Sequence, residues 1–308
     1  MIPVMQRTRT TDRSLRMWLP RLLSCIRLDE VLLLQGTPLL GALFSMGAIT
    51  RAKGLEILLL VAASSCLVAH VFVLNDWTGS SADLRDPNRA TQVFAARGVS
   101  RRAAGALCLA LLTVSFLLLT SLGSTAVLLG FALAVLSALY SAPWFAMKGV
   151  PLASSAMHLI GGLLHFLLGY SLFHTLDVRS LEIGSFFALM FAAGHLTHET
   201  RDCGSDLLNG IQTNAVKFGR TRSFIAGFLL FTAADILLFI LAVQGPVPRI
   251  LVAVAAIYPL HAWWTLRTLA AGLTFENIRL LQVRYRVLYG VLGVIMVLAV
   301  TTEIGRAS

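Results

Sequence analysis

Charged side chains are scarce in this chain. Asp, Glu, Lys and Arg make up 13% of its 308 residues, whereas soluble domains contain about 25%. Hydrophobic residues make up 57%, and the mean hydropathy is +0.79. A composition this apolar excludes a water-soluble globule and predicts a protein embedded in a lipid bilayer.

Cysteine is rare, and no two cysteines form a CxxC pair. The four are Cys25, Cys66, Cys108 and Cys203. The pattern therefore indicates neither a zinc site nor a disulfide framework. The stretch 15–26 contains Pro20 and Ser24 and lacks both an uninterrupted apolar core and a small-residue cleavage site, so it does not resemble a signal peptide. Its mixture of Trp, Leu and Arg predicts instead a helix lying on the membrane surface.

Long apolar runs are abundant, and spanning the hydrocarbon core takes roughly 20 such residues per helix. Nine runs qualify: 31–49, 55–74, 103–120, 125–140, 152–173, 183–197, 223–243, 250–266 and 287–301. They are continuous rather than alternating, which favours helices over the strands of a barrel. The sequence thus predicts an all-α bundle of about nine transmembrane helices at 31–303, preceded by an interfacial segment at 1–30.

The basic residues predict the orientation of this bundle. With a cytoplasmic N-terminus, only five of the 25 Lys and Arg residues fall outside: Arg51, Lys53, Arg179, Arg249 and Arg306. Cytoplasmic loops carry such an excess of basic residues, so topology explains the net charge of +10. No basic helix or aromatic-basic module indicates nucleic acid. We expect a multi-pass protein of the cell membrane, with its functional loops, among them 75–102 and 198–222, on the cytoplasmic side.

Acidic residues are few, and six of the 15 lie in two short segments. They are Asp76, Asp83 and Asp86 in the first segment and Glu199, Asp202 and Asp206 in the second. Asp76 and Asp83 are two helical turns apart, and the three acids of the second segment also share one helical face. Like charges so placed repel one another unless a divalent cation lies between them. Mg²⁺ commonly binds through one or two carboxylates plus substrate phosphates, so the spacing predicts a magnesium-diphosphate site.

These segments resemble motifs of the UbiA superfamily of membrane prenyltransferases. The first motif of that family, NDxxDxxxD, is matched by Asn75, Asp76 and Asp83, while Gly79 occupies the middle acidic position. The segment 87–89, PNR, also follows the pattern of one branch of the family.

Two further segments resemble the same family, and the likeness covers roughly residues 27–300. The second motif, DxxDxxxD, is matched by Glu199, Asp202 and Asp206, with one Glu in place of Asp. Its continuation, DxxxGxxT, is matched at 206–213. Between the two motifs, 140–148 (YSAPWFAMK) resembles the YSAPP…K loop of the family.

The resemblance implies a magnesium-dependent transfer of a prenyl group from an isoprenyl diphosphate to a lipophilic acceptor, which we expect to be aromatic. The implied metal ligands are Asp76, Asp83, Glu199, Asp202 and Asp206, with Glu199 either a ligand or a partner of the ligands. The implied diphosphate-binding residues are Asn75, Arg89, Tyr140, Lys148 and Arg201. The implied catalytic residues are Lys148, His198 and Arg201, with His195 as a further candidate base. For the arginines and Lys148, topology alone is a competing explanation, and for the histidines so is helix packing.

Several alternatives stay open at this point. A terpene cyclase or a transferase acting on a polyprenyl phosphate would use similar motifs. A transporter is a further alternative, although its acids would be expected near the middle of the membrane. Gly79 also fits a relative that binds isoprenoids without turnover. If the chain is active, we expect the first site to work with fewer protein ligands, and Asp86 to pair with Arg85 or Arg89 on the surface. The sequence assigns no role to Asp235, His158 or His165, and no acceptor.

Overall fold

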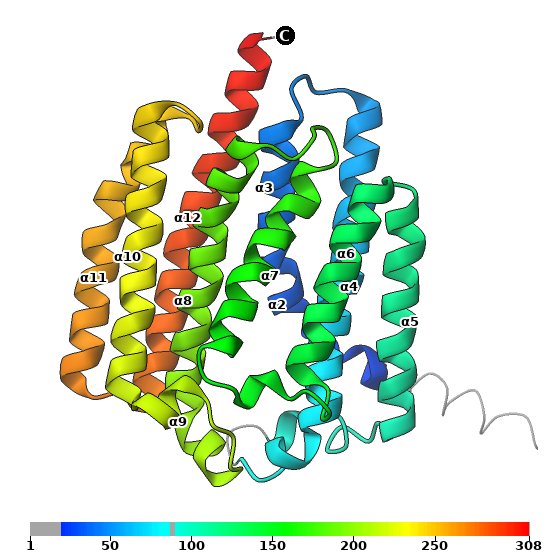
Figure 1. Ribbon diagram of the computed structural model, residues 1–308, viewed down its shortest axis with the longest axis vertical. Helices are drawn as coiled ribbons and strands as arrows, with labels where there is room; N and C mark the ends of the chain where they lie inside the picture. The colour runs from blue at the N-terminus through cyan, green and yellow to red at the C-terminus, as the bar shows by residue number, and fades with distance from the viewer. Residues whose placement is uncertain (1–19, 87–89, 308) are drawn as a thin grey trace, which may run out of the picture.

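The computed structural model describes residues 20–86 and 90–307, and within them it contains helices and no strand. The helices lie side by side in one bundle (Figure 1). They are α2 (Leu28–Leu34), α3 (Gly36–Ser45), α4 (Arg51–Asp83), α5 (Arg101–Thr120), α6 (Ser124–Ser141), α7 (Ala153–Tyr170), α8 (Val178–Leu208), α9 (Asn214–Phe218), α10 (Arg220–Gln244), α11 (Val254–Ala271) and α12 (Phe275–Ala307). Short 3-10 turns span Ala90–Gln92, Met147–Gly149 and Arg249–Ala253. The all-α prediction is confirmed.

All nine predicted runs fall on helices. In the described part of the chain, seven helices are long and apolar enough to cross a membrane: α4, α5, α6, α8, α10, α11 with the turn before it, and α12. The other two runs form shorter helices. The first is divided between α2 and α3 at Gln35, and the fifth forms α7.

Two helices are longer than the sequence predicted. α4 continues to Asp83 and α8 to Leu208, so the acids of both motifs lie on helices rather than in loops, and only Asp86 lies beyond a helix end. At 1.5 Å per residue the 33 residues of α4 extend about 50 Å, beyond a hydrocarbon core of about 30 Å. The acids therefore stand on rigid extensions of membrane-spanning helices.

The centre of the bundle depends on close contact between α3 and α7. A β-carbon added to Gly41 would lie 2.2 Å from the carbonyl oxygen of Phe166, and one added to Gly169 only 1.8 Å from that of Pro38. Small residues permit such an approach of two backbones. Phe166 and Tyr170 are buried in the core that α3, α7, α8, α10 and α12 share.

Polar pairs also join helices inside the bundle. Ser64 of α4 lies 2.8 Å from His165 Nε2 of α7. Tyr289 of α12 donates a hydrogen bond to Asp235 of α10 at 2.9 Å and lies 3.0 Å from His261 of α11. Side-chain hydrogen bonds of this kind stabilise helix association in lipid, which gives His165 and Asp235 a structural explanation.

The predicted surface helix at 15–26 is described only from residue 20 onward. Within that part, Leu22 and Cys25 are buried against Val93, Phe94 and Val99. The segment thus packs on the connection between α4 and α5 instead of lying only on a membrane surface, because this connection offers it an apolar cluster.

Candidate active site

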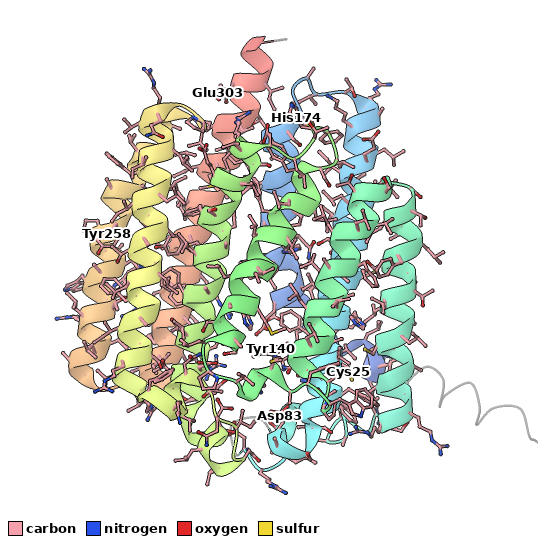
Figure 2. The ribbon with its side chains drawn as sticks, in the orientation of Figure 1. Cys25, Asp83, Tyr140, His174, Tyr258 and Glu303 are labelled. Atoms are coloured by element: carbon pink, nitrogen blue, oxygen red, sulfur yellow. The ribbon has the colours of Figure 1, made fainter. Side chains whose placement is uncertain are left out.

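The two acidic motifs meet at one end of the bundle, here called the motif end. Asn209, which ends α8, donates a hydrogen bond from Nδ2 to the carbonyl oxygen of Ala82 in the last turn of α4, at 3.3 Å. Asp83 directly follows Ala82 in the chain, and Asp206 lies three residues before Asn209. Asp83 and Tyr140 lie at this end, while His174 and Glu303 lie at the opposite end (Figure 2).

In the first motif, Asp76 is held by an arginine from the start of the chain. Arg27 donates from Nε to Oδ2 at 3.2 Å and from Nη2 to Oδ1. Its guanidinium also lies 5.6 Å from the centre of the Phe72 ring and 3.6 Å from the Glu30 carboxylate. No local pattern in the sequence indicates this contact, because 49 residues separate Arg27 from Asp76.

In the second motif, Asp202 is held by its neighbour Arg201. The guanidinium donates to both carboxylate oxygens, at 2.7 and 3.0 Å. Its remaining Nη1 donates to Gln282 Oε1 of α12 at 2.7 Å. Both motifs therefore present an aspartate whose two oxygens are engaged by one guanidinium, the geometry in which arginine binds carboxylate and phosphate most strongly.

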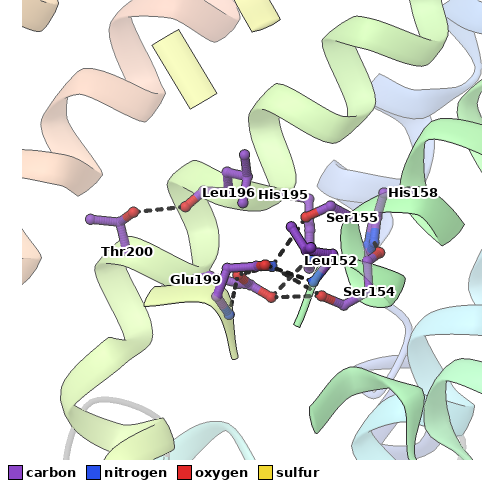
Figure 3. A network of polar contacts seen from close by, with 9 residues as sticks. Leu152, Ser154, Ser155, His158, His195, Leu196, Glu199 and Thr200 are labelled. Carbon is purple, nitrogen blue, oxygen red and sulfur yellow. Dashed lines mark hydrogen bonds and ion pairs between the residues drawn. The ribbon is translucent and has the colours of Figure 1, made fainter. Parts of the chain in front are cut away.

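Glu199 is the centre of a buried polar network (Figure 3). Its Oε2 accepts hydrogen bonds from the backbone nitrogen and Nδ2 of Asn214, at 3.0 and 2.8 Å. Its Oε1 accepts one from Ser154 at 3.1 Å and lies 3.0 Å from His195 Nε2. Both carboxylate oxygens of Glu199 are thus engaged by side chains and backbone of α7, α8 and α9.

Two histidines and a tyrosine extend this network toward α6. The rings of His158 and His195 are stacked, with centres 3.7 Å apart and planes at 11°. The ring of Tyr140 is nearly perpendicular to both, with its centre 5.0 Å from that of His158 and 6.3 Å from that of His195. His158 donates a hydrogen bond from Nδ1 to the carbonyl oxygen of Ser154 at 2.8 Å. Tyr140 thus lies beside the network that holds Glu199.

Lys148 lies in the α6–α7 connection, whose backbone is constrained. Ala146 and Leu152 have backbone φ values of 44° and 64°, which residues other than glycine rarely adopt. Asn214 accepts a hydrogen bond from the Leu152 nitrogen at 2.7 Å and so ties this connection to the α8–α9 segment. Strained backbone is maintained only where surrounding contacts enforce it, and it is frequent at functional sites.

The other predicted residues are distributed unevenly. His198 points toward α12, where Arg286 Nη2 lies 3.4 Å from its Nε2, and so it does not join His195 and Glu199. Asn75 is half-buried in α4. Arg89 lies outside the described residues. Asp86 is 3% exposed, so the expectation of a surface position was wrong: Asp86 follows the end of α4 at Asp83 and is buried there.

These residues fit a divalent cation only together with other oxygen donors. Within the described residues no group of three or more His, Cys, Asp or Glu side chains is arranged to hold a metal ion. One or two carboxylates plus phosphate oxygens form a common magnesium site. Asp76, Asp83, Asp202 and Asp206 stand on two adjoining helix ends, which suits a ligand that bridges them.

No curated protein matches the sequence. The model of the UbiA prenyltransferase family, however, matches residues 36–275. The chain belongs to this family. The resemblance drawn from the motifs is thereby confirmed, and the matched region contains both acidic motifs and the Tyr140–Lys148 loop.

Solved structures of UbiA proteins share the fold. A UbiA homologue from Archaeoglobus fulgidus bound to GPP and Mg²⁺ is 17% identical, with a TM-score of 0.71 over 92% of this chain and 99% of that one. The apo UbiA homologue from Aeropyrum pernix K1 is 20% identical, with a TM-score of 0.69 over 88% and 98%. A structure of digeranylgeranylglyceryl phosphate synthase is 15% identical, with a TM-score of 0.68 over 92% and 98%. At these identities the likeness establishes the fold.

Sequence reasoning missed the partners of Glu199. Ser154 and Asn214 come from α7 and α9, on either side of the second motif. Asn214 directly follows the last residue of the DxxxGxxT continuation, and this position was the only available signal. Ser154 has none, since a serine in an apolar helix usually bonds its own backbone.

Proposed function

We propose that this UbiA-family protein transfers the prenyl group of an isoprenyl diphosphate to a lipophilic acceptor, with Mg²⁺ as the required cation. The observation that carries the proposal is the hydrogen bond between Asn209 and Ala82, which joins the two motif-bearing helix ends. Family membership supports the reaction class, and the fold relative from Archaeoglobus fulgidus with GPP and Mg²⁺ supports the ligand class. We further propose that the acceptor is aromatic.

In this proposal the carboxylates of Asp76, Asp83, Asp202 and Asp206 hold the cation. Bound Mg²⁺ would supply Lewis-acid stabilisation of the departing diphosphate. Lys148 and Arg201 would bind phosphate oxygens, since ammonium and guanidinium groups suit them. These charges favour cleavage of the allylic C–O bond, because negative charge grows on the leaving oxygen as the bond breaks.

The remaining residues orient this site and keep it dry. Glu199 fixes the register of α8 against α7 and α9 through its three hydrogen bonds with Ser154 and Asn214. Tyr140 lies beside the His158–His195 pair. The apolar bundle would enclose the isoprenoid tail and exclude water, which protects a carbocation-like prenyl group from hydrolysis.

The test is an assay of purified full-length protein in nanodiscs. It would receive Mg²⁺, radiolabelled isoprenyl diphosphates of several chain lengths and a panel of phenols, quinone precursors and other lipophilic acceptors. The expected product is a prenylated acceptor whose formation stops on addition of EDTA. A cyclised hydrocarbon formed without acceptor would assign a terpene cyclase instead, and binding without any turnover would assign a non-catalytic isoprenoid-binding protein.

A further inference from the structure

We propose that Arg27 and Arg201 are exchangeable counter-ions of the two acidic motifs, so that the divalent cation and the diphosphate enter the site together. This inference rests on the proposed function and names how binding at that site is coupled. It concerns the order and cooperativity of binding in this chain.

The two motifs repeat one arrangement with different architecture. In each, a guanidinium reaches both oxygens of one predicted metal-ligating aspartate, Asp76 in α4 and Asp202 in α8. Arg27 directly precedes α2, whereas Arg201 directly precedes Asp202 within α8. Because different segments supply the two arginines, the pairing of a guanidinium with a predicted metal-ligating aspartate arises independently in each motif.

A bare divalent cation is disfavoured at such a site. To bind the carboxylate oxygens that Arg27 now engages, the cation would displace the Arg27 guanidinium and break a partly buried charge pair. Breaking a charge pair in this way leaves an uncompensated charge and is costly. Glu30, 3.6 Å from Arg27, compensates only in part. The cation and the displaced arginine would also repel each other across the short distance between them.

A diphosphate removes both costs. Among the described residues, no three carboxylates are grouped to hold a cation by themselves. The diphosphate oxygens would complete its coordination. They also accept the forked hydrogen bonds that each arginine gives up. Arg201 stays anchored by Gln282 during this exchange, at 2.7 Å. The cation and the diphosphate are therefore expected to strengthen each other's binding, and by linkage the effect is the same in both directions.

The test measures binding rather than turnover. Full-length protein in nanodiscs would be titrated with Mn²⁺, followed by electron paramagnetic resonance against protein-free mixtures. The titration would be repeated with geranyl S-thiolodiphosphate, whose C–S bond resists cleavage. For the wild type we expect Mn²⁺ alone to bind weakly, and the analogue to tighten it by at least about tenfold, within the range of ordinary coupling.

The variants separate exchange from a merely structural role. In Arg27→Gln, Mn²⁺ alone should bind several-fold more tightly than in the wild type, while the analogue binds more weakly, so the coupling shrinks. The coupling in Arg27→Lys should lie between those of the wild type and Arg27→Gln, since lysine keeps the charge but cannot donate two parallel hydrogen bonds. Arg201→Gln should repeat the pattern. Arg97→Gln is the matched control, because Arg97 bonds the Ser24 carbonyl oxygen, and its coupling should equal that of the wild type.

Each outcome decides between the two proposals. If Arg27→Gln binds Mn²⁺ alone no more tightly than the wild type and keeps full coupling, the exchange is wrong while the proposed function stands. Should Arg27→Gln fail to fold, the same comparison is made with Arg27→Lys. If the wild type binds no Mn²⁺ even with the analogue, both the proposed function and the exchange are overturned.

Discussion

Asn214 donates two hydrogen bonds to the same oxygen of Glu199, one from its backbone nitrogen at 3.0 Å and one from Nδ2 at 2.8 Å. The pair joins α9 to α8, and through Ser154 it also reaches α7. A carboxylate buried in this way needs its donors, since each unsatisfied buried polar group costs about 1–3 kcal/mol. The second motif thus depends on a residue outside the acids themselves.

Replacing Asn214 should therefore destabilise the protein. Asn214→Ala removes the side-chain donor to Glu199 and the acceptor of the Leu152 nitrogen, so we expect a loss of about 2–4 kcal/mol in the free energy of unfolding. The measurement is thermal or denaturant unfolding in detergent micelles. Asn277→Ala is the control, because Asn277 is only half-buried and its side chain bonds only nearby carbonyl oxygens, and it should cost less than half as much. Equal losses in the two variants would contradict the network.

Glu199 and Asp202 should differ in their effect on metal binding. Asp202→Ala and Asp206→Ala should lower turnover by orders of magnitude, since each removes a predicted metal ligand. Glu199→Gln should lower turnover too, but leave the Mn²⁺ affinity in the presence of a diphosphate within about threefold of the wild type. Glu276→Ala, a change at an exposed acid of α12, should alter neither quantity. Near wild-type turnover in Asp202→Ala would rule out this metal site.

The motif end is expected to face the cytoplasm. Ser81 is exposed beside the first motif, and Thr175 is exposed at the opposite end of the bundle. In intact cells, a membrane-impermeant thiol reagent should label Thr175→Cys and fail to label Ser81→Cys. The four native cysteines are buried or half-buried and would be replaced by serine or alanine first. Labelling of Ser81→Cys without permeabilisation would reverse the orientation predicted from the basic residues.

The sequence predicted much of this fold because lipid restricts the choices. A continuous apolar run can only be a helix, and each of the nine runs is helical. The ends of α4 and α8 were harder to predict, because Ser80, Ser81 and Ser205 are no longer apolar yet are compatible with a helix. Hydropathy marks the end of the hydrocarbon core and not the end of the helix.

The candidate site was predicted only in part, because a local pattern does not show which distant residues it meets. Spacing of acids along one helix gives a shared face, but not the neighbours that this face meets. The contact of Arg27 with Asp76 crosses 49 residues, and His198 turns to Arg286, 88 residues away. Asp86 is buried, although its charge and its place after the end of an apolar run predicted exposure. Such contacts follow from helix packing, which a single sequence does not encode in any local pattern.

Gly79 provides the last prediction. A β-carbon at this position would have ordinary contact with Asp83 Oδ2, at 3.5 Å, and meets no other atom within 4 Å. A carboxylate introduced there would therefore fit and would stand beside Asp83. Gly79→Asp should lower the Mg²⁺ concentration needed for half-maximal prenyl transfer by about threefold to tenfold, because it adds an oxygen ligand that replaces water.

The matched control is Gly79→Ala, which adds the β-carbon and improves helix propensity by about 1 kcal/mol without adding a ligand. It should raise the thermal stability slightly and leave the Mg²⁺ requirement unchanged. Asp86→Ala should change the Mg²⁺ requirement little, but it should lower the free energy of unfolding by about 1–3 kcal/mol, since Asp86 is buried and has partners. If Gly79→Asp and Gly79→Ala shift the Mg²⁺ requirement equally, the effect belongs to the helix and the first motif does not take the added carboxylate as a ligand.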